Sequence, residues 1–196
     1  MLIHPWDRGT SDEQWIEFVR RQAFGQLVAP GIDQVYPVVV PTQYTLFSPR
    51  DIVLHLARPN PIWRAIEQNP MVTLSVAGDW AFIPSDWKAI GDEDPRHGIP
   101  TTFYSAVQLI CEATVFDDVE TKESILGAQL LQSQPGLDVI PPGEHGRTLN
   151  GIRGMGLKVY AIRDKFKYGG NLDQAHRDAI RKRLEDGGNP AADHIE

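Results

Sequence analysis

Apolar and polar positions follow a helical period in some segments of this chain and a two-residue strand period in others. Four helices are predicted, over residues 11–22, 60–68, 119–131 and 171–185. Ser11 and Gln14 have the form of a capping box at the first helix. Asn60 is the expected cap of the second helix, Pro61 suits its first position, and Asn171 is the expected cap of the last helix.

Between these helices lie short β-branched and aromatic runs separated by Pro, Gly, Asp and Ser. They predict strands over residues 25–29, 35–40, 51–57, 71–76, 80–83, 101–116 and 156–166. Gly78 and Asp79 predict a hairpin turn between two of these strands. Segments 84–100 and 134–146 are typical of surface loops.

Strands that follow one another, with helices only at intervals, argue against a parallel doubly wound sheet. The fold class predicted is therefore mainly β with peripheral helices, an antiparallel barrel. We expect residues 1–186 to form a single domain, because no linker or repeat divides them, and residues 187–196 to be a mobile tail.

Composition narrows the possible functions. The net charge of −7 disfavours direct DNA binding, which depends on neutralising phosphates. The longest apolar stretches fall short of the roughly 20 residues that span a bilayer, and no signal peptide is evident, so we expect a cytoplasmic protein without a membrane span. Cys111, the single cysteine, is expected to be buried. His97 and His145, beside acidic residues, are interpreted as solvated rather than as metal ligands.

The most informative segment is 54–64, where a predicted strand leads into an Asn-Pro helix start. The amides that open a helix can hold an anion, and Arg58 and Arg64 could add charge-assisted hydrogen bonds from either side. The alternative is that Asn60 only caps the helix while both arginines face water.

The string H-L-A-R-P-N-P-I-W-R at residues 55–64 resembles a motif of the PaiB-like "FMN-binding negative transcriptional regulator" family, which is related to pyridoxamine-phosphate-oxidase-like flavoproteins. Further similar stretches lie in the same order as in the family, at residues 4–6, 83–87, 99–104 and 165–171. The resemblance implies an FMN-binding split barrel, with FMN held at a homodimer interface by both subunits. The chain departs from the family pattern where Thr102 and Phe103 replace a Trp-Asn pair and where Gly169 and Gly170 replace Ser-Gln.

The residues expected to bind this cofactor are His55, Leu56, Ala57, Arg58, Asn60, Arg64, Trp87, Thr101, Thr102, Tyr104, Lys165, Lys167 and Asn171. The group from 55 to 64 is assigned to the phosphate end of FMN. At the ring end, the hydroxyls of Thr101, Thr102 and Tyr104 could bond isoalloxazine edge atoms.

Two pairs of ring-end residues leave alternatives open. Trp87 or Phe103 could stack on the ring, with core or interface packing as the alternative for each. Lys165 and Lys167 share one strand face and could approach the phosphate or the flavin carbonyls, with exposure to water as the alternative.

Three functions follow from these observations. The first is an FMN-binding, oxidoreductase-like protein, with a small-molecule redox substrate and with catalytic residues that the sequence does not identify. The second is a non-enzymatic regulator that senses flavin or acts through a partner. The third is haem binding in the same barrel, with His55 or a histidine of the C-terminal segment as axial ligand.

Overall fold

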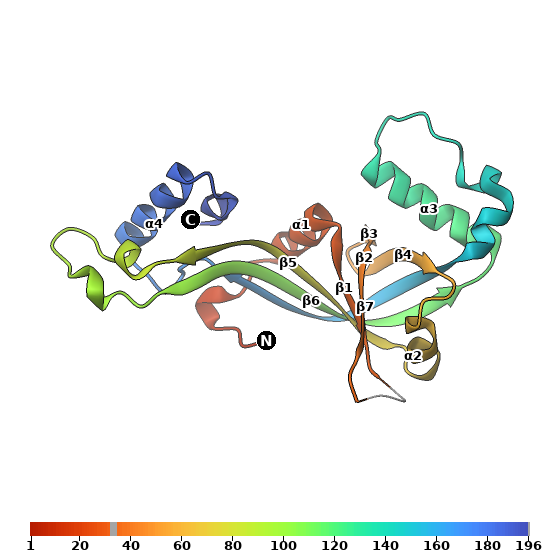
Figure 1. The fold of residues 1–196 in the computed structure, drawn as a ribbon, viewed down its shortest axis with the longest axis horizontal. Coiled ribbons are helices and arrows are strands. Elements are labelled where there is room, and N and C mark those ends of the chain that lie inside the picture. The colour runs from red at the N-terminus through yellow and green to blue at the C-terminus, as the bar shows by residue number, and fades with distance from the viewer. Residues whose placement is uncertain (32–34, 196) are drawn as a thin grey trace. The chain divides into compact units, whose positions relative to one another are not determined.

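A computed structural model describes residues 1–31 and 35–195 (Figure 1). Its helices are α1 (Asp12–Gln22), α2 (Ile62–Gln68), α3 (Val119–Ser133) and α4 (Gln174–Asp186). Its strands are β1 (Phe24–Ala29), β2 (Val38–Gln43), β3 (Thr45–Ser48), β4 (Asp51–Ala57), β5 (Met71–Ile83), β6 (Thr101–Phe116) and β7 (Ile152–Lys167). Short 3-10 helices are η1 (Pro5–Asp7), η2 (Ser85–Lys88), η3 (Pro95–His97), η4 (Pro142–Gly151) and η5 (Pro190–His194).

The described strands form one sheet in the order β2-β1-β5-β6-β7-β4-β3. Strand β1 pairs antiparallel with β2 and β5, and β4 pairs antiparallel with β3 and β7. Buried and less buried residues alternate along β4 and β6, as expected of strands with one face in a core. The mainly β, antiparallel class predicted from the sequence is confirmed.

The chain divides into two compact units. We call residues 1–15, 77–107 and 163–196 the first unit, and residues 16–76 and 108–162 the second unit. Strands β5, β6 and β7 contribute residues to both units. The expectation that residues 1–186 behave as a single folding domain stays a prediction.

The core of the second unit gathers apolar side chains from α1, α2 and the strands. Leu27, Ile52 and Leu54 are completely buried, and so is Cys111, as expected. Tyr44 is also buried, and its hydroxyl donates to the Val19 carbonyl at 2.8 Å. Burial raises the pKa of this phenol far above its ordinary value, so Tyr44 stays neutral.

The core of the first unit includes the C-terminal segment. Ala191, Ala192 and Ile195 are at most 3 % exposed and join a cluster with Ile83, Phe103, Tyr168, Ile180 and Leu184. From the same segment, the His194 ring lies 4.9 Å from that of Tyr168, measured between ring centres. Within the segment expected to be a mobile tail, residues 190–195 are therefore packed, because small apolar side chains there fill space beside α4.

The expected hairpin at residues 78–79 is wrong. Strand β5 runs without a break from Met71 to Ile83, and the connection to β6 is the long segment 84–100. Asp79 is held in the strand by two side chains: its carbonyl accepts from Tyr168 Oη at 2.8 Å, and its carboxylate lies 3.0 Å from His194 Nε2. These long-range contacts override a local turn preference.

Two helix starts also differ from expectation. The cap of α4 is Asp173, whose carboxylate accepts from the amide of His176, and Asn171 lies outside the helix. At α1, Gln14 Oε1 accepts from the amide of Thr10, one residue before the expected Ser11. The cap predicted at Asn171 is therefore wrong by two residues, an error of the size that is common at helix ends.

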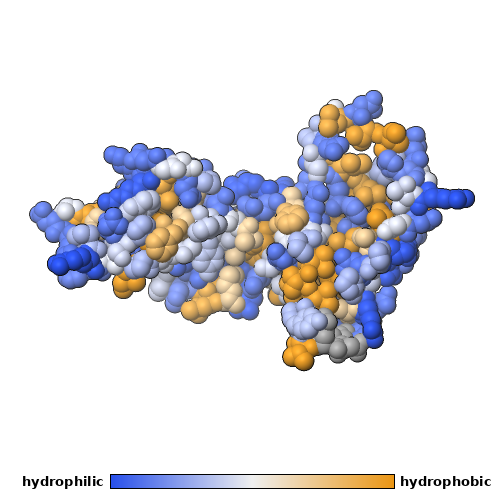
Figure 2. All heavy atoms as spheres, in the orientation of Figure 1, coloured by the Kyte–Doolittle hydropathy of each residue, from blue (hydrophilic) through white to orange (hydrophobic). Residues whose placement is uncertain are grey.

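Several large apolar side chains remain exposed. Leu131, Leu137 and Ile140 lie at the end of α3 and in the loop after it, where apolar atoms gather in Figure 2. Trp80 and Phe82 are exposed on β5. Among the helices of the described residues, none is long and apolar enough to cross a membrane.

Candidate functional site

In the second unit, side chains of the strand-to-helix segment form hydrogen bonds with the backbone of that same segment. Asn60 Oδ1 accepts from the Ile62 amide at 3.1 Å, so Asn60 supplies a hydrogen bond to the first amide of α2, although Pro61 occupies the position directly before the helix. The buried Trp63 ring donates from Nε1 to the Ala57 carbonyl at 2.9 Å. One of the amides that open α2 is thus already paired, and Trp63 ties the helix to the end of β4.

Arg58 lies in a network of paired charges. Its Nε donates to the Asn150 carbonyl at 2.8 Å, and its Nη2 lies 2.8 Å from the Asp117 carboxylate. Arg153 also pairs with Asp117 and with Glu67, each at 3.0 Å. Burial acts to raise the pKa of Asp117, but hydrogen bonds from Arg153 and Arg58 outweigh it and leave that pKa below its ordinary value.

This network contains two arginines and two carboxylates, so its formal charges cancel. A phosphate at Arg58 must therefore share the guanidinium with Asp117, which repels it. The assignment of Arg58 and Asn60 to the FMN phosphate stays a prediction, and the structure shows a second role for Arg58, which holds the end of β4 to the start of β7.

The other candidates in this unit lie in different surroundings. Leu56 is buried, and Ala57 and Arg64 are exposed. His55 Nδ1 lies 2.5 Å from Gln129 Oε1 on the buried face of α3. Because an amide oxygen can only accept, Nδ1 is the donor in this contact. Lys122, on the same face of α3, is 1 % exposed and donates to the Leu149 carbonyl.

In the first unit, four of the predicted residues come together on β6 and β7. Lys167 Nζ donates to Thr101 Oγ1 at 2.6 Å. The ammonium groups of Lys165 and Lys167 lie 5.5 and 6.0 Å from the centre of the Tyr104 ring, within the range of cation–π attraction. The two-residue spacing of the lysines, which places them on one strand face, was the signal in the sequence for this cluster.

Lys165 is paired with an acid that the sequence did not indicate. Its ammonium lies 3.5 Å from Asp7 Oδ2 and donates to the Leu2 carbonyl at 2.9 Å. The side chains are 8 % and 3 % exposed, so this is a buried ion pair. Lys165 therefore holds the N-terminal segment against β7.

Among the described residues, the structure shows no contact between this cluster and the remaining ring-end candidates. Trp87 is half-buried and packs on the apolar core of the first unit, while its carbonyl accepts from Arg183 at 2.6 Å. Phe103 is buried edge-on against Tyr168. Packing therefore accounts for Phe103. Thr102 is half-buried and Asn171 is exposed.

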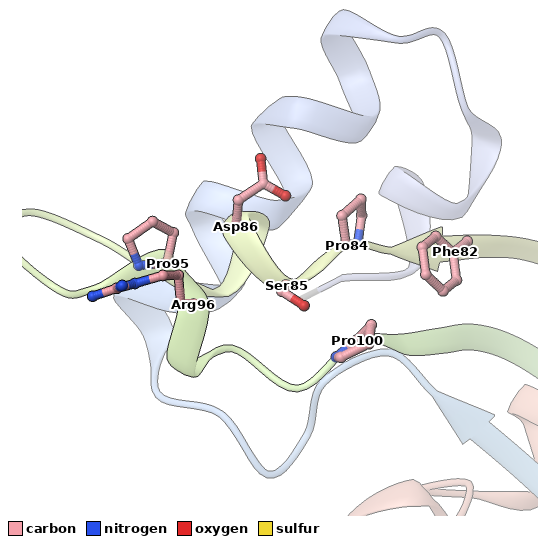
Figure 3. Close-up of a pocket in the computed structure, with 7 residues that line it drawn as sticks. All are labelled: Phe82, Pro84, Ser85, Asp86, Pro95, Arg96 and Pro100. Carbon is pink, nitrogen blue, oxygen red and sulfur yellow. The ribbon is translucent and has the colours of Figure 1, made fainter.

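Two hollows open in the segment between β5 and β6. The larger, of about 500 Å³, is lined by Phe82, Pro84, Ser85, Asp86, Pro95, Arg96 and Pro100 (Figure 3). The smaller, of about 370 Å³, is lined by Lys88, Ala89, Glu93, Asp94, His97 and Gly98. Gly98 must remain glycine here, since a Cβ atom would lie 2.0 Å from the Ser85 carbonyl oxygen.

His176 joins this segment to α4. Its ring lies 2.8 Å from Asp173 and 3.0 Å from Glu93, and its side chain is 18 % exposed. The hydrogen bond with Asp173, followed by that with Glu93, raises the pKa of His176. Glu93 accepts from the Ile90 amide and from His176, which lowers the pKa of Glu93.

We expect segment 89–98 to loosen as pH rises through the raised pKa of His176. A histidine whose pKa is raised in the folded state stabilises that state at pH values below its unfolded-state pKa, which is about 6.5. This stabilisation is lost as the pH rises through the raised pKa. Hydrogen exchange of the amides of residues 89–98, measured across this range, should show it. The variant His176→Asn keeps a polar side chain without titrating; if it retains the same pH dependence, His176 is not the cause.

The antiparallel sheet agrees with the barrel class predicted from the sequence, and the cluster on β6 and β7 presents ammonium and hydroxyl groups. A family model described as "Putative FMN-binding domain" matches residues 1–161, most of the chain. The protein therefore belongs to this FMN-binding domain family. Lys165 and Lys167 lie just beyond the matched residues.

Solved structures show the same fold at low sequence identity. A conserved hypothetical protein from Mycobacterium tuberculosis is 13% identical with a TM-score of 0.64, covering 89% of this chain and 95% of that one. A FAD and haem binding protein from Mycobacterium smegmatis is 16% identical with a TM-score of 0.63, covering 87% and 78%. The flavocytochrome Anf3 from Azotobacter vinelandii is 16% identical with a TM-score of 0.59, covering 86% and 73%. No curated protein matches the sequence.

Proposed function

We propose that the protein binds FMN as the redox cofactor of an oxidoreductase-like activity on a small molecule. The observation that carries this proposal is the cluster of Thr101, Tyr104, Lys165 and Lys167 in a chain of the FMN-binding domain family. The flavin carbonyls and phosphate accept hydrogen bonds, and the cluster offers ammonium and hydroxyl donors. The finer PaiB-like assignment and a homodimer with FMN at its interface belong to this proposal.

When bound, FMN supplies hydride and electron transfer, and the protein supplies orientation and electrostatics. Lys167 is positioned by Thr101 and by the Tyr104 ring, so its ammonium is held in place before any ligand arrives. A fixed positive charge favours added negative charge on a neighbouring ring. Lys165, with its charge paired to Asp7, contributes position more than net charge.

A titration with FMN and riboflavin tests the proposal and the phosphate assignment together. The native protein should bind FMN with saturation and show flavin absorption bands. Arg58→Ala should weaken FMN about ten- to a hundred-fold, because a charge-assisted hydrogen bond contributes about 1.5 to 3 kcal/mol. Riboflavin, which lacks the phosphate, should bind poorly and be nearly unaffected by this change.

Asp117→Asn is the matched control for Arg58. It frees the guanidinium from its carboxylate partner, so FMN should bind more tightly if Arg58 contacts the phosphate. Equal losses for both flavins in Arg58→Ala, together with no gain in Asp117→Asn, would assign Arg58 to structure alone. Failure of the native protein to bind any flavin would contradict the proposed function.

Haem binding is a second candidate, favoured by one observation. Histidines that ligate a metal usually donate from their other ring nitrogen to an acceptor, and His55 Nδ1 has Gln129 Oε1 in that position. The absorption spectrum that tests FMN binding separates the two, because a haem Soret band in place of flavin bands would favour His55.

A further inference from the structure

The larger of the two hollows between β5 and β6 has walls made mostly of rings. Its volume is about 500 Å³, which lies within the range of small-molecule pockets. Figure 3 shows the rings of Phe82, Pro84 and Pro100 at one end of the hollow and Pro95 at the other. The Phe82 side chain is 57 % exposed, so its ring is available to a ligand. Flat apolar walls of this kind suit the face of an aromatic ring.

The backbone around this hollow is fixed before any ligand arrives. The chain at Gly98 packs directly on the backbone of Ser85, since a Cβ atom at residue 98 would lie 2.0 Å from the Ser85 carbonyl oxygen. Arg183 of α4 donates to the carbonyls of Asp86 and Trp87 at 3.4 and 2.6 Å, which ties η2 to α4. A hollow held in this way loses little conformational entropy when a ligand enters.

The charged side chains at the hollow cancel one another. Asp86 and Arg96 line it with opposite charges. The Arg96 guanidinium is bound to both carboxylate oxygens of Asp94, and Arg183, which donates to the Asp86 carbonyl, adds the second positive charge. A charged ligand would therefore lose its hydration without gaining an uncompensated partner, which is unfavourable. A neutral ligand fits this balance.

Ser85 supplies a polar group to the hollow. Its side chain is half-buried, and no residue that the structure describes forms a hydrogen bond with its hydroxyl. Figure 3 shows this hydroxyl directed toward Pro100, which belongs to the wall of rings. A serine hydroxyl can both donate and accept, so it can bond to a hydroxyl or carbonyl substituent of a ring bound there.

We propose that this hollow binds a neutral aromatic small molecule other than flavin, with the ring against Phe82 and Pro100 and a polar substituent on the Ser85 hydroxyl. Phenols are the simplest compounds of this class. The hollow is formed by residues of the first unit alone, and the inference does not depend on flavin binding.

Titration of the full-length protein with phenol, followed by NMR of its amides, tests the site. The amide signals of residues around the hollow should shift and reach saturation. Cyclohexanol keeps the hydroxyl but lacks a flat ring, and benzoate keeps the ring but carries a charge, so each should bind at least about fivefold more weakly than phenol. Equal affinities for the three compounds, or no saturable binding of phenol, would overturn the inference.

Substitutions in the wall locate the binding. Phe82→Ala should weaken phenol binding about tenfold, because it removes the aromatic ring of the wall. Trp80→Ala is the matched control, since Trp80 is also exposed on β5 but does not line the hollow. Ser85→Ala should weaken phenol binding about two- to tenfold and leave the binding of toluene, which has no hydroxyl, nearly unchanged. Equal effects of Phe82→Ala and Trp80→Ala on phenol would place the binding elsewhere and refute the assignment.

FMN is the competing occupant, because its isoalloxazine ring is also flat. Phenol should bind with the same affinity to flavin-free and FMN-saturated protein. Displacement of phenol by FMN would assign the hollow to the flavin ring and contradict a separate site. Phenol binding that depends on Phe82, in a protein that binds no flavin, would support this inference and contradict the proposed function.

Discussion

Lys165→Met is expected to lower the free energy of unfolding by about 3 to 5 kcal/mol, the usual effect of removing one partner of a buried ion pair. The substitution leaves the Asp7 carboxylate, 3 % exposed, without its positive partner. It also removes the donor to the Leu2 carbonyl. Urea denaturation of native and variant proteins measures the change.

The double variant Asp7→Leu, Lys165→Met distinguishes the effect of an unpaired buried charge from the effect of lost packing. Replacing both partners by apolar residues should recover most of the stability, because no buried charge then remains unpaired. A loss under 1 kcal/mol in Lys165→Met would contradict burial of this pair, since exposed pairs contribute about that much.

Trp63→Ala is expected to lower the free energy of unfolding by about 3 to 5 kcal/mol, as large-to-small changes of buried aromatic residues do. Trp63 is 4 % exposed, donates to the Ala57 carbonyl, and has the Arg153 guanidinium 5.1 Å from its ring centre. The substitution opens a cavity under α2 and leaves Arg153 without its aromatic contact.

Trp63→Phe is the control, because it keeps much of the volume and loses the indole donor. The decrease in the free energy of unfolding should be smaller, roughly 1 to 3 kcal/mol, which is the cost of leaving the Ala57 carbonyl without its donor. Thermal or urea unfolding of both variants distinguishes the two contributions. If Trp63→Ala proves no more destabilising than Trp63→Phe, packing of the ring does not hold α2 in place.

The sequence predicted helices and strands best where the apolar and polar pattern of a single segment is complete by itself. Strands β4 and β6 have the predicted bounds, and helices α1 and α3 lie close to theirs. Strand β3 was missed because its four residues are too short to show a period. The hairpin at residues 78–79 was wrong because Tyr168 and His194, distant in sequence, hold Asp79 in an extended strand.

The candidate site was predicted in part. Thr101, Tyr104, Lys165 and Lys167 were identified from their spacing and from the family resemblance, and they lie together in the structure. Asp7 was missed, because its role depends on a partner far along the chain, Lys165.

By itself, the sequence determined the mainly β class, the residue types available for binding, and the hydrogen bond of Asn60 at the start of α2. These properties depend on residues near one another in the chain, so periodicity and spacing carry them. Only the tertiary structure decided which charges are paired: Arg58 with Asp117, and Lys165 with Asp7. The physical reason is that electrostatic energy depends on distance and burial, which strand pairing and packing set between residues that are remote in the sequence.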